Sequence, residues 1–129
     1  MDRFPIGFWN YTSIDVWEDD SCVQEWADAG MTLAMSPRFG PEDTDRMRPI
    51  LDRSADLGIR VILCPNHTYW RHLSDVGEER YRADFAAAVA QFGDHPAVFG
   101  FHAGDEPNTA AFEDACRALR IQKEAAPPL

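Results

Sequence analysis

Two acidic residues stand side by side in the segment GFHAGDEPN, residues 100–108: Asp105 and Glu106. The apolar run AVFGF precedes them, so we expect the pair at the end of a buried strand. Repulsion between neighbouring carboxylates separates their proton affinities, and burial raises the pKa of both. One of the two acids is then protonated near neutral pH and can act as the general acid of a glycosidase. The alternative is an exposed turn, because Asp, Pro and Asn are ordinary turn residues.

Aromatic and polar side chains follow other apolar runs in the same way. The candidates are Asn10 and Tyr11 after the first run, Asn66, His67 and Trp70 after the third, and His102 and Asn108 around the acidic pair. Aromatic faces stack on the C–H-rich faces of sugars, while amide and imidazole groups bind sugar hydroxyl groups. These residues therefore predict a carbohydrate-binding cleft. The alternative for Asn66 and His67 is that they only satisfy backbone groups of their loop.

Four apolar runs would position these residues: FPIGFWNY, MTLAMS, RVILCPN and AVFGFHA. Each is mostly continuous and does not alternate with polar residues, which is typical of parallel strands buried on both faces. A helical pattern follows each run. The apolar stripes are Val23, Trp26 and Ala27; Met47, Ile50, Leu51 and Ala55; Tyr81, Phe85, Ala88, Val89 and Phe92; and Phe112, Ala115, Cys116 and Leu119. Pro49 disrupts a helix interior, so we expect the second helix to begin just before it.

The order β-α-β-α-β-α-β-α predicts an α/β fold with parallel strands. No G-x-G-x-x-G follows the first run, which argues against a dinucleotide-binding, doubly wound sheet. A (β/α)8 barrel typically needs ~250 residues, and this chain has 129. We therefore expect four consecutive βα units over residues 1–129, the N-terminal half of a TIM-barrel catalytic domain, with strands five to eight absent.

The segment HPAVFGFHAGDEPN resembles the fourth-strand signature of the large clan of retaining TIM-barrel glycoside hydrolases, which ends in Asn-Glu-Pro. The segments WADAGMT, LDRSADLGIRVIL and DHPAVFGF are similar to the clan's first four βα units. The resemblance implies that Glu106 is the catalytic acid/base. Asp105 replaces the clan's Asn, which implies altered sugar contacts because an ionised Asp only accepts hydrogen bonds. His67 resembles a third-strand histidine that some members place in the substrate cleft.

The resemblance also places the catalytic nucleophile outside this chain, because the clan's nucleophile is a Glu at the end of strand seven. We therefore expect a glycoside hydrolase-like fragment that carries the acid/base and is inactive alone. Two alternatives remain open. One is a metal-dependent TIM-barrel hydrolase or isomerase with His67, His102, Asp105 and Glu106 as ligands. The other is a non-catalytic, carbohydrate-binding half-barrel.

Charge and composition limit the partners. The formal net charge of −10 disfavours nucleic acid and anionic membranes and leaves neutral ligands open. Among these, a carbohydrate substrate is the partner that the strand-end residues predict. No apolar stretch approaches the ~20 residues of a membrane span, and no signal peptide pattern is present at the N-terminus, which favours the cytoplasm. Cys22, Cys64 and Cys116 are far apart, so we predict no zinc site and no cofactor. Open sheet edges predict self-association.

Overall fold

Three parallel strands form the centre of the protein in a computed structural model that describes residues 4–17 and 19–126. They are β1 (Leu33–Phe39), β2 (Arg60–Pro65) and β3 (Val98–Phe101). The strand order is β1-β2-β3, and both neighbouring pairs are parallel. Three of the four apolar runs therefore form strands, as predicted, because β-branched and aromatic residues in these runs pack on both faces of the sheet.

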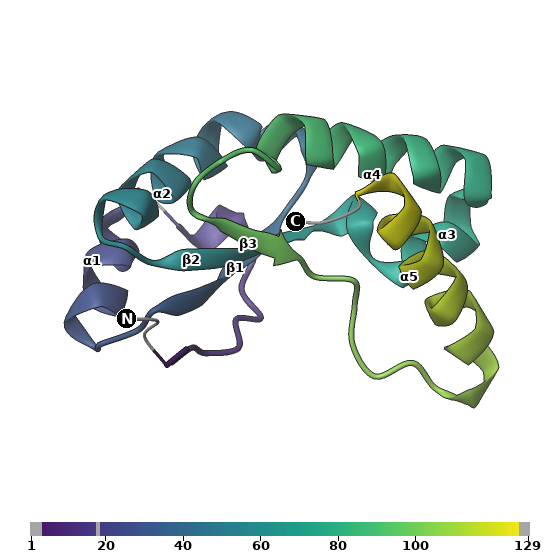
Figure 1. Ribbon diagram of the computed structural model, residues 1–129, viewed down its shortest axis with the longest axis horizontal. Coiled ribbons are helices and arrows are strands. Elements are labelled where there is room, and N and C mark those ends of the chain that lie inside the picture. The colour runs from purple at the N-terminus through teal and green to yellow at the C-terminus, as the bar shows by residue number, and fades with distance from the viewer. Residues whose placement is uncertain (1–3, 18, 127–129) are drawn as a thin grey trace.

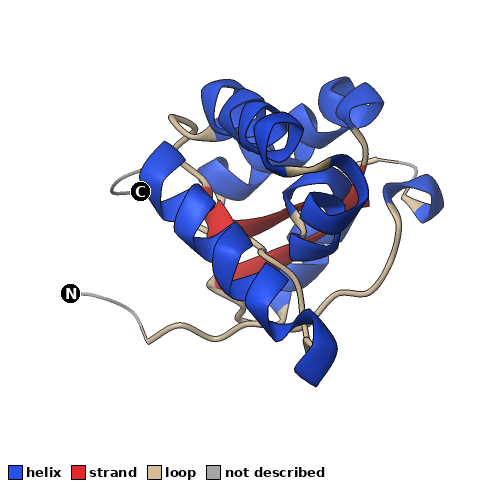
Figure 2. Cartoon of the chain, turned by 90° about the vertical axis from the view of Figure 1, so that its right-hand side faces the viewer, coloured by secondary structure: helices blue, strands red, loops and turns tan. Residues whose placement is uncertain are grey.

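The described residues also form five α-helices, which pack around the sheet and beyond its ends (Figures 1 and 2). They are α1 (Ser21–Asp28), α2 (Thr44–Asp56), α3 (Trp70–Val76), α4 (Glu78–Phe92) and α5 (Phe112–Ala125). In Figure 1, α3 and α5 lie beyond the carboxyl ends of the strands, towards which the β3 arrow points. No helix of the described residues is long and apolar enough to span a membrane.

The first apolar run is not a strand, so the expectation of four consecutive βα units, half of a TIM barrel, is wrong. Among the described residues before β1 there are only two isolated parallel bridges, Gly7 with Leu33 and Ser13 with Arg38. The Asn10 side chain interrupts the pairing between them. Its Nδ2 donates to the Met35 carbonyl oxygen at 3.3 Å, so a side chain occupies an acceptor that a paired strand would use.

The helical patterns are confirmed for the most part. Tyr81, Phe85, Ala88 and Phe92 are buried on one face of α4. The second helix begins at Thr44, five residues before Pro49, so the expected start beside Pro49 is wrong. Pro49 is exposed within α2. In α5 the predicted stripe is partly wrong, because Phe112 and Leu119 are exposed.

Two apolar clusters stabilise the fold. The larger lies between the sheet and α1, α2 and α4, and includes Val61, Leu63 and Val98. The smaller joins α3, α4 and α5. A buried polar network ties this second cluster to the turn after β2. The Tyr81 hydroxyl donates to the Thr68 carbonyl oxygen at 2.8 Å, and Gln122 Nε2 donates to the same oxygen at 2.7 Å.

Candidate functional site

The carboxyl ends of the three parallel strands meet at one edge of the sheet. The segments that leave this edge are residues 40–42 after β1, 66–70 after β2 and 102–108 after β3. We call them together the strand-end edge. In open parallel sheets, ligands bind outside the carboxyl ends of the strands. The strand-end edge is therefore the place where functional side chains are expected to gather.

Four rings form what we call the aromatic platform: Trp9, Tyr11, Tyr69 and His102. The His102 ring packs edge-on against Trp9, with centroids 5.2 Å apart, and against Tyr69, with centroids 5.1 Å apart. Tyr11 continues the row, because its ring lies 6.0 Å from that of Trp9. Trp9 is 50% exposed and Tyr11 69% exposed. The platform thus presents aromatic surface to solvent beside the end of β3.

Two members of the platform are uncharged at neutral pH. Burial lowers the pKa of His102 below its usual 6.5, and the negative charge of Asp105 partly opposes this effect. Burial also raises the pKa of Tyr69 to about 12, and Asp105 acts in the same direction. A neutral imidazole and a protonated phenol can each donate and accept hydrogen bonds. Asp105 follows His102 by three residues, so the loop that carries it continues from the platform.

Asp105 and Glu106 are both exposed, so the expected burial of this pair is wrong. Strand β3 ends at Phe101, and three further residues separate it from the acids. The exposed-turn alternative describes their surroundings. Glu106 has a φ of 41°, the left-handed region. This conformation costs a residue with a Cβ roughly 1–2 kcal/mol relative to its right-handed counterpart, and such outliers cluster at functional sites.

Trp70 holds the loop that carries the two acids. It is only 8% exposed, and its backbone N–H donates to the Ala103 carbonyl oxygen at 2.8 Å. Gly104 has a φ of 118°, and a Cβ at this position would overlap the Trp70 indole. Trp70, a predicted substrate-binding residue, is therefore placed beneath the loop, where it fixes the loop against α3.

Asn10 and Asn108, two predicted substrate-binding residues, use their side chains for hydrogen bonds within the protein. Asn10 is 6% exposed, and its Oδ1 accepts hydrogen bonds from the backbone N–H and the hydroxyl of Thr12. Asn108 caps the short 3-10 helix Thr109–Ala111, because its Oδ1 accepts from the Ala111 N–H at 3.0 Å. Asn66 is exposed at the start of the 3-10 helix Asn66–Thr68.

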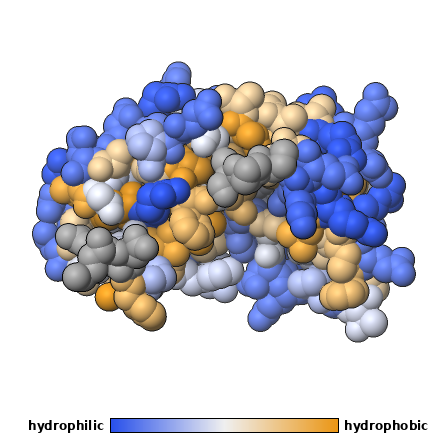
Figure 3. All heavy atoms as spheres, viewed as in Figure 1, coloured by the Kyte–Doolittle hydropathy of each residue, from blue (hydrophilic) through white to orange (hydrophobic). Residues whose placement is uncertain are grey.

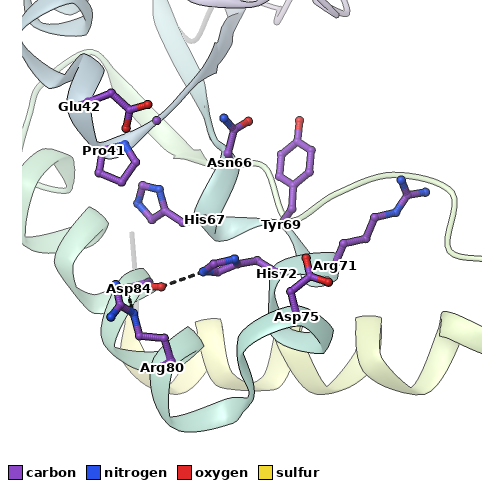
Figure 4. Close-up of a pocket in the computed structure, with 11 residues that line it drawn as sticks. Pro41, Glu42, Asn66, His67, Tyr69, Arg71, His72, Asp75, Arg80 and Asp84 are labelled. Carbon is purple, nitrogen blue, oxygen red and sulfur yellow. Dashed lines mark hydrogen bonds and ion pairs between the residues drawn. The ribbon is translucent and has the colours of Figure 1, made fainter.

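His67 lies in a second group of side chains around a cavity of about 470 Å3, which we call the side pocket (Figure 4). Its lining includes Glu42, Asn66, His67, Arg71, Asp75 and Asp84. Figure 4 shows the His67 ring between Pro41 and Asp84. Asp84 lies 2.8 Å from His72 Nε2 and accepts a hydrogen bond from Arg80 Nε at 2.8 Å.

Sequence reasoning missed most of the side pocket. His72 and Asp75 lie on α3, a helix that no apolar stripe in the sequence predicts, and Arg80 and Asp84 lie on α4. The only signal was the spacing of Arg80 and Asp84, which suits an ion pair one helical turn apart.

The two groups of side chains differ in their electrostatic surroundings. Burial lowers the pKa of His67, and the charges of Asp84 and Glu42 oppose this effect, whereas His102 responds to Asp105. His67 Nδ1 is buried and has no hydrogen-bond partner among the described residues. Tyr69 joins the groups, because it lines the side pocket and packs against His102.

No group of three or more His, Cys, Asp or Glu side chains within residues 4–17 and 19–126 is arranged to hold a metal ion. Of the four metal ligands proposed from the sequence, His67 lines the side pocket. The other three, His102, Asp105 and Glu106, lie in the segment after β3.

Comparison with known proteins gave no relative: no protein-family model matches the chain, and no curated protein matches it.

Proposed function

We propose that the strand-end edge binds carbohydrate and that Glu106 acts as the acid/base in hydrolysis of a glycosidic bond. The observation that carries this proposal is the aromatic platform beside the loop with Asp105 and Glu106. Exposed rings such as those of Trp9 and Tyr11 are the surfaces on which sugar faces stack. The exposed carboxylates of the adjacent loop are free to reach a bound ligand.

The polar members of the site suit neutral sugars. His102 and Tyr69 are uncharged at neutral pH, so both can donate to and accept from hydroxyl groups. Asp105 adds an acceptor beside them. A neutral ligand also fits a chain whose net charge of −10 repels anions.

Glu106 would protonate the glycosidic oxygen while the bond to the sugar breaks. The reaction also needs a second carboxyl group, roughly 5–5.5 Å away if the anomeric configuration is retained. In the glycoside hydrolase clan whose signature residues 95–108 resemble, a Glu on another strand supplies it.

A carbohydrate-binding function without catalysis is the second candidate. The exposure of both acids favours it, because neither carboxyl group is held in a buried, water-excluding site. Both candidates share the platform as the binding surface. They differ in the role of Glu106.

Calorimetric titration of the chain with soluble gluco-, manno- and galacto-oligosaccharides tests the shared claim. We expect Trp9→Ala to weaken binding about tenfold or more, which corresponds to ~1.4 kcal/mol of lost stacking. Phe4→Ala is the matched control: Phe4 is also an exposed aromatic residue, but it precedes β1, and its carbonyl accepts from Thr32 at the opposite end of that strand. Binding that survives Trp9→Ala unchanged would refute the platform as the sugar site.

Glu106→Gln separates the two candidates when hydrolysis of unactivated glycosides is assayed beside sugar binding. A catalytic Glu106 predicts turnover of unactivated glycosides about 10²–10⁴-fold lower, because the amide cannot donate a proton. Sugar binding should be retained. Unchanged turnover would remove Glu106 from the mechanism.

A further inference from the structure

The side pocket continues directly from the aromatic platform. Tyr69 belongs to both, since its ring packs against His102 with centroids 5.1 Å apart and the residue is among those that line the pocket. The pocket is bounded by the turn after β1, the turn after β2, and helices α3 and α4 (Figure 4). A ligand that extends beyond the platform on the Tyr69 side therefore enters this pocket.

The charges around the side pocket favour an uncharged ligand. Three carboxylates, Glu42, Asp75 and Asp84, line it together with two guanidinium groups, Arg71 and Arg80. The pocket therefore has no net positive charge that would attract a phosphate group or a sugar acid. Burial keeps the pKa of His67 below its usual 6.5, so its imidazole is neutral at pH 7.

Hydrogen-bonding groups of both kinds are present and accessible. Asn66 and Arg71 are exposed donors on the rim, and Asp75 is an exposed acceptor. His67 Nδ1 is buried and unpartnered within the described chain. A buried polar atom without a partner is costly, and a turn of the His67 ring towards the pocket would let a ligand hydroxyl group pair with it. The volume of about 470 Å3 lies within the range of small-molecule sites.

We propose that the ligand is a neutral oligosaccharide of at least two sugar units, with one unit on the aromatic platform and the next in the side pocket. This inference rests on the proposed function. It adds that the protein distinguishes oligosaccharides from monosaccharides, and that His67 and Asn66 bind hydroxyl groups of the second unit. Tyr69 separates the two subsites.

The test is a calorimetric series of mono-, di-, tri- and tetrasaccharides from whichever sugar binds in the gluco, manno and galacto panel. We expect the affinity to rise about tenfold or more when the oligosaccharide becomes long enough to enter the side pocket. Further sugar units should then add little. His67→Phe and Asn66→Ala should each reduce this gain about two- to tenfold, the value of one hydrogen bond. The monosaccharide affinity, measured in the same series, should fall less than the oligosaccharide affinity in both variants.

Gln24→Ala is the control, because Gln24 is an exposed amide on α1, outside the pocket. Asn66 is also exposed, so Asn66→Ala keeps the test valid if His67→Phe fails to fold. Affinity that is independent of chain length, or a gain that survives both pocket variants, would overturn the two-subsite inference and leave the platform intact. A failure of every sugar to bind would overturn the proposed function as well.

Discussion

At the scale of single residues, the candidate site depends on groups held in unusual conditions. Glu106 has a positive φ in a loop fixed by the contact between Gly104 and Trp70. His102 and His67 have lowered pKa values because both rings are partly buried. Such features have a cost in stability, and that cost can be measured separately from any activity.

Replacement of Glu106 by glycine should leave the protein as stable or more stable. Glycine adopts a positive φ without the steric cost that a Cβ imposes, so we expect Glu106→Gly to raise the free energy of unfolding by up to about 1 kcal/mol. Glu106→Ala keeps the Cβ and is the matched control, for which we expect no gain. Urea denaturation of both variants measures the difference. A clear loss of stability in Glu106→Gly would show that the side chain itself stabilises the loop.

Stability should fall as the pH decreases through the range just below 6.5. The folded pKa values of His67 and His102 are lowered from 6.5, so the unfolded chain binds protons first as the pH falls. Proton binding to the unfolded chain then favours unfolding until the folded pKa values are passed. Thermal melting at a series of pH values should show this loss. The double variant His67→Gln, His102→Gln should show a smaller pH dependence, and an unaltered dependence would contradict the assignment.

At the scale of elements, the turn after β2 is the point at which the helices and the site meet. Thr68 accepts hydrogen bonds through its carbonyl oxygen from Tyr81 on α4 and Gln122 on α5. Its hydroxyl donates to the Pro65 carbonyl oxygen at 3.0 Å. The same turn carries His67 and Tyr69, so this network determines where two of the site's rings lie.

Loss of the Tyr81 hydroxyl should destabilise the protein. Tyr81 is fully buried, and its oxygen also accepts from Gln122 Nε2 at 2.6 Å. We expect Tyr81→Phe to lower the free energy of unfolding by about 1–2 kcal/mol, because a buried donor at Gln122 loses a partner. Tyr11→Phe, at an exposed tyrosine, should have almost no effect. Equal stability of Tyr81→Phe and wild type in urea would show that the network contributes nothing.

The elements that could be predicted from the sequence are those with long apolar patterns. Strands β1 to β3 and helix α4 follow from such patterns. Residues 4–11 have an equally apolar pattern, but the hydrogen bond of the Asn10 side chain to Met35 replaces strand pairing, and composition does not reveal this. Helix α3 is seven residues long, with only Trp70 and Leu73 buried, too short for a clear periodicity. The side pocket was missed because it depends on how α3 and α4 pack.

At the scale of the whole molecule, apolar surface is exposed around the sheet. Figure 3 shows apolar residues gathered over the centre of the molecule, with hydrophilic residues towards its ends. A groove of about 300 Å3 on the sheet is lined by residues that include Phe8, Leu33, Met35 and Ile62. Strand β3 pairs with β2 on one side, and no other described strand pairs with its outer edge. An open edge with apolar surface favours association between chains.

Self-association should therefore increase with protein concentration and weaken when the edge is charged. Phe99 lies on β3 and is 54% exposed. We expect Phe99→Lys to shift the population towards monomer, because a lysine on an edge strand opposes strand pairing. Light scattering after size-exclusion chromatography measures this. A wild-type protein that stays monomeric at every concentration would contradict the expectation, as would a variant that associates equally well.

The most direct test of carbohydrate binding at the strand-end edge is an amide and indole NMR spectrum recorded during titration with the oligosaccharide that binds. The chain has four tryptophans, and therefore four indole N–H signals. We predict that the Trp9 indole and the backbone amides of His102, Asp105 and Glu106 shift together, with one common dissociation constant. The indole of Trp26, which is buried in the larger apolar cluster and packs against Phe8 and Trp17, should not move. Shifts confined to residues away from this edge, with Trp9 and Glu106 unchanged, would contradict the account.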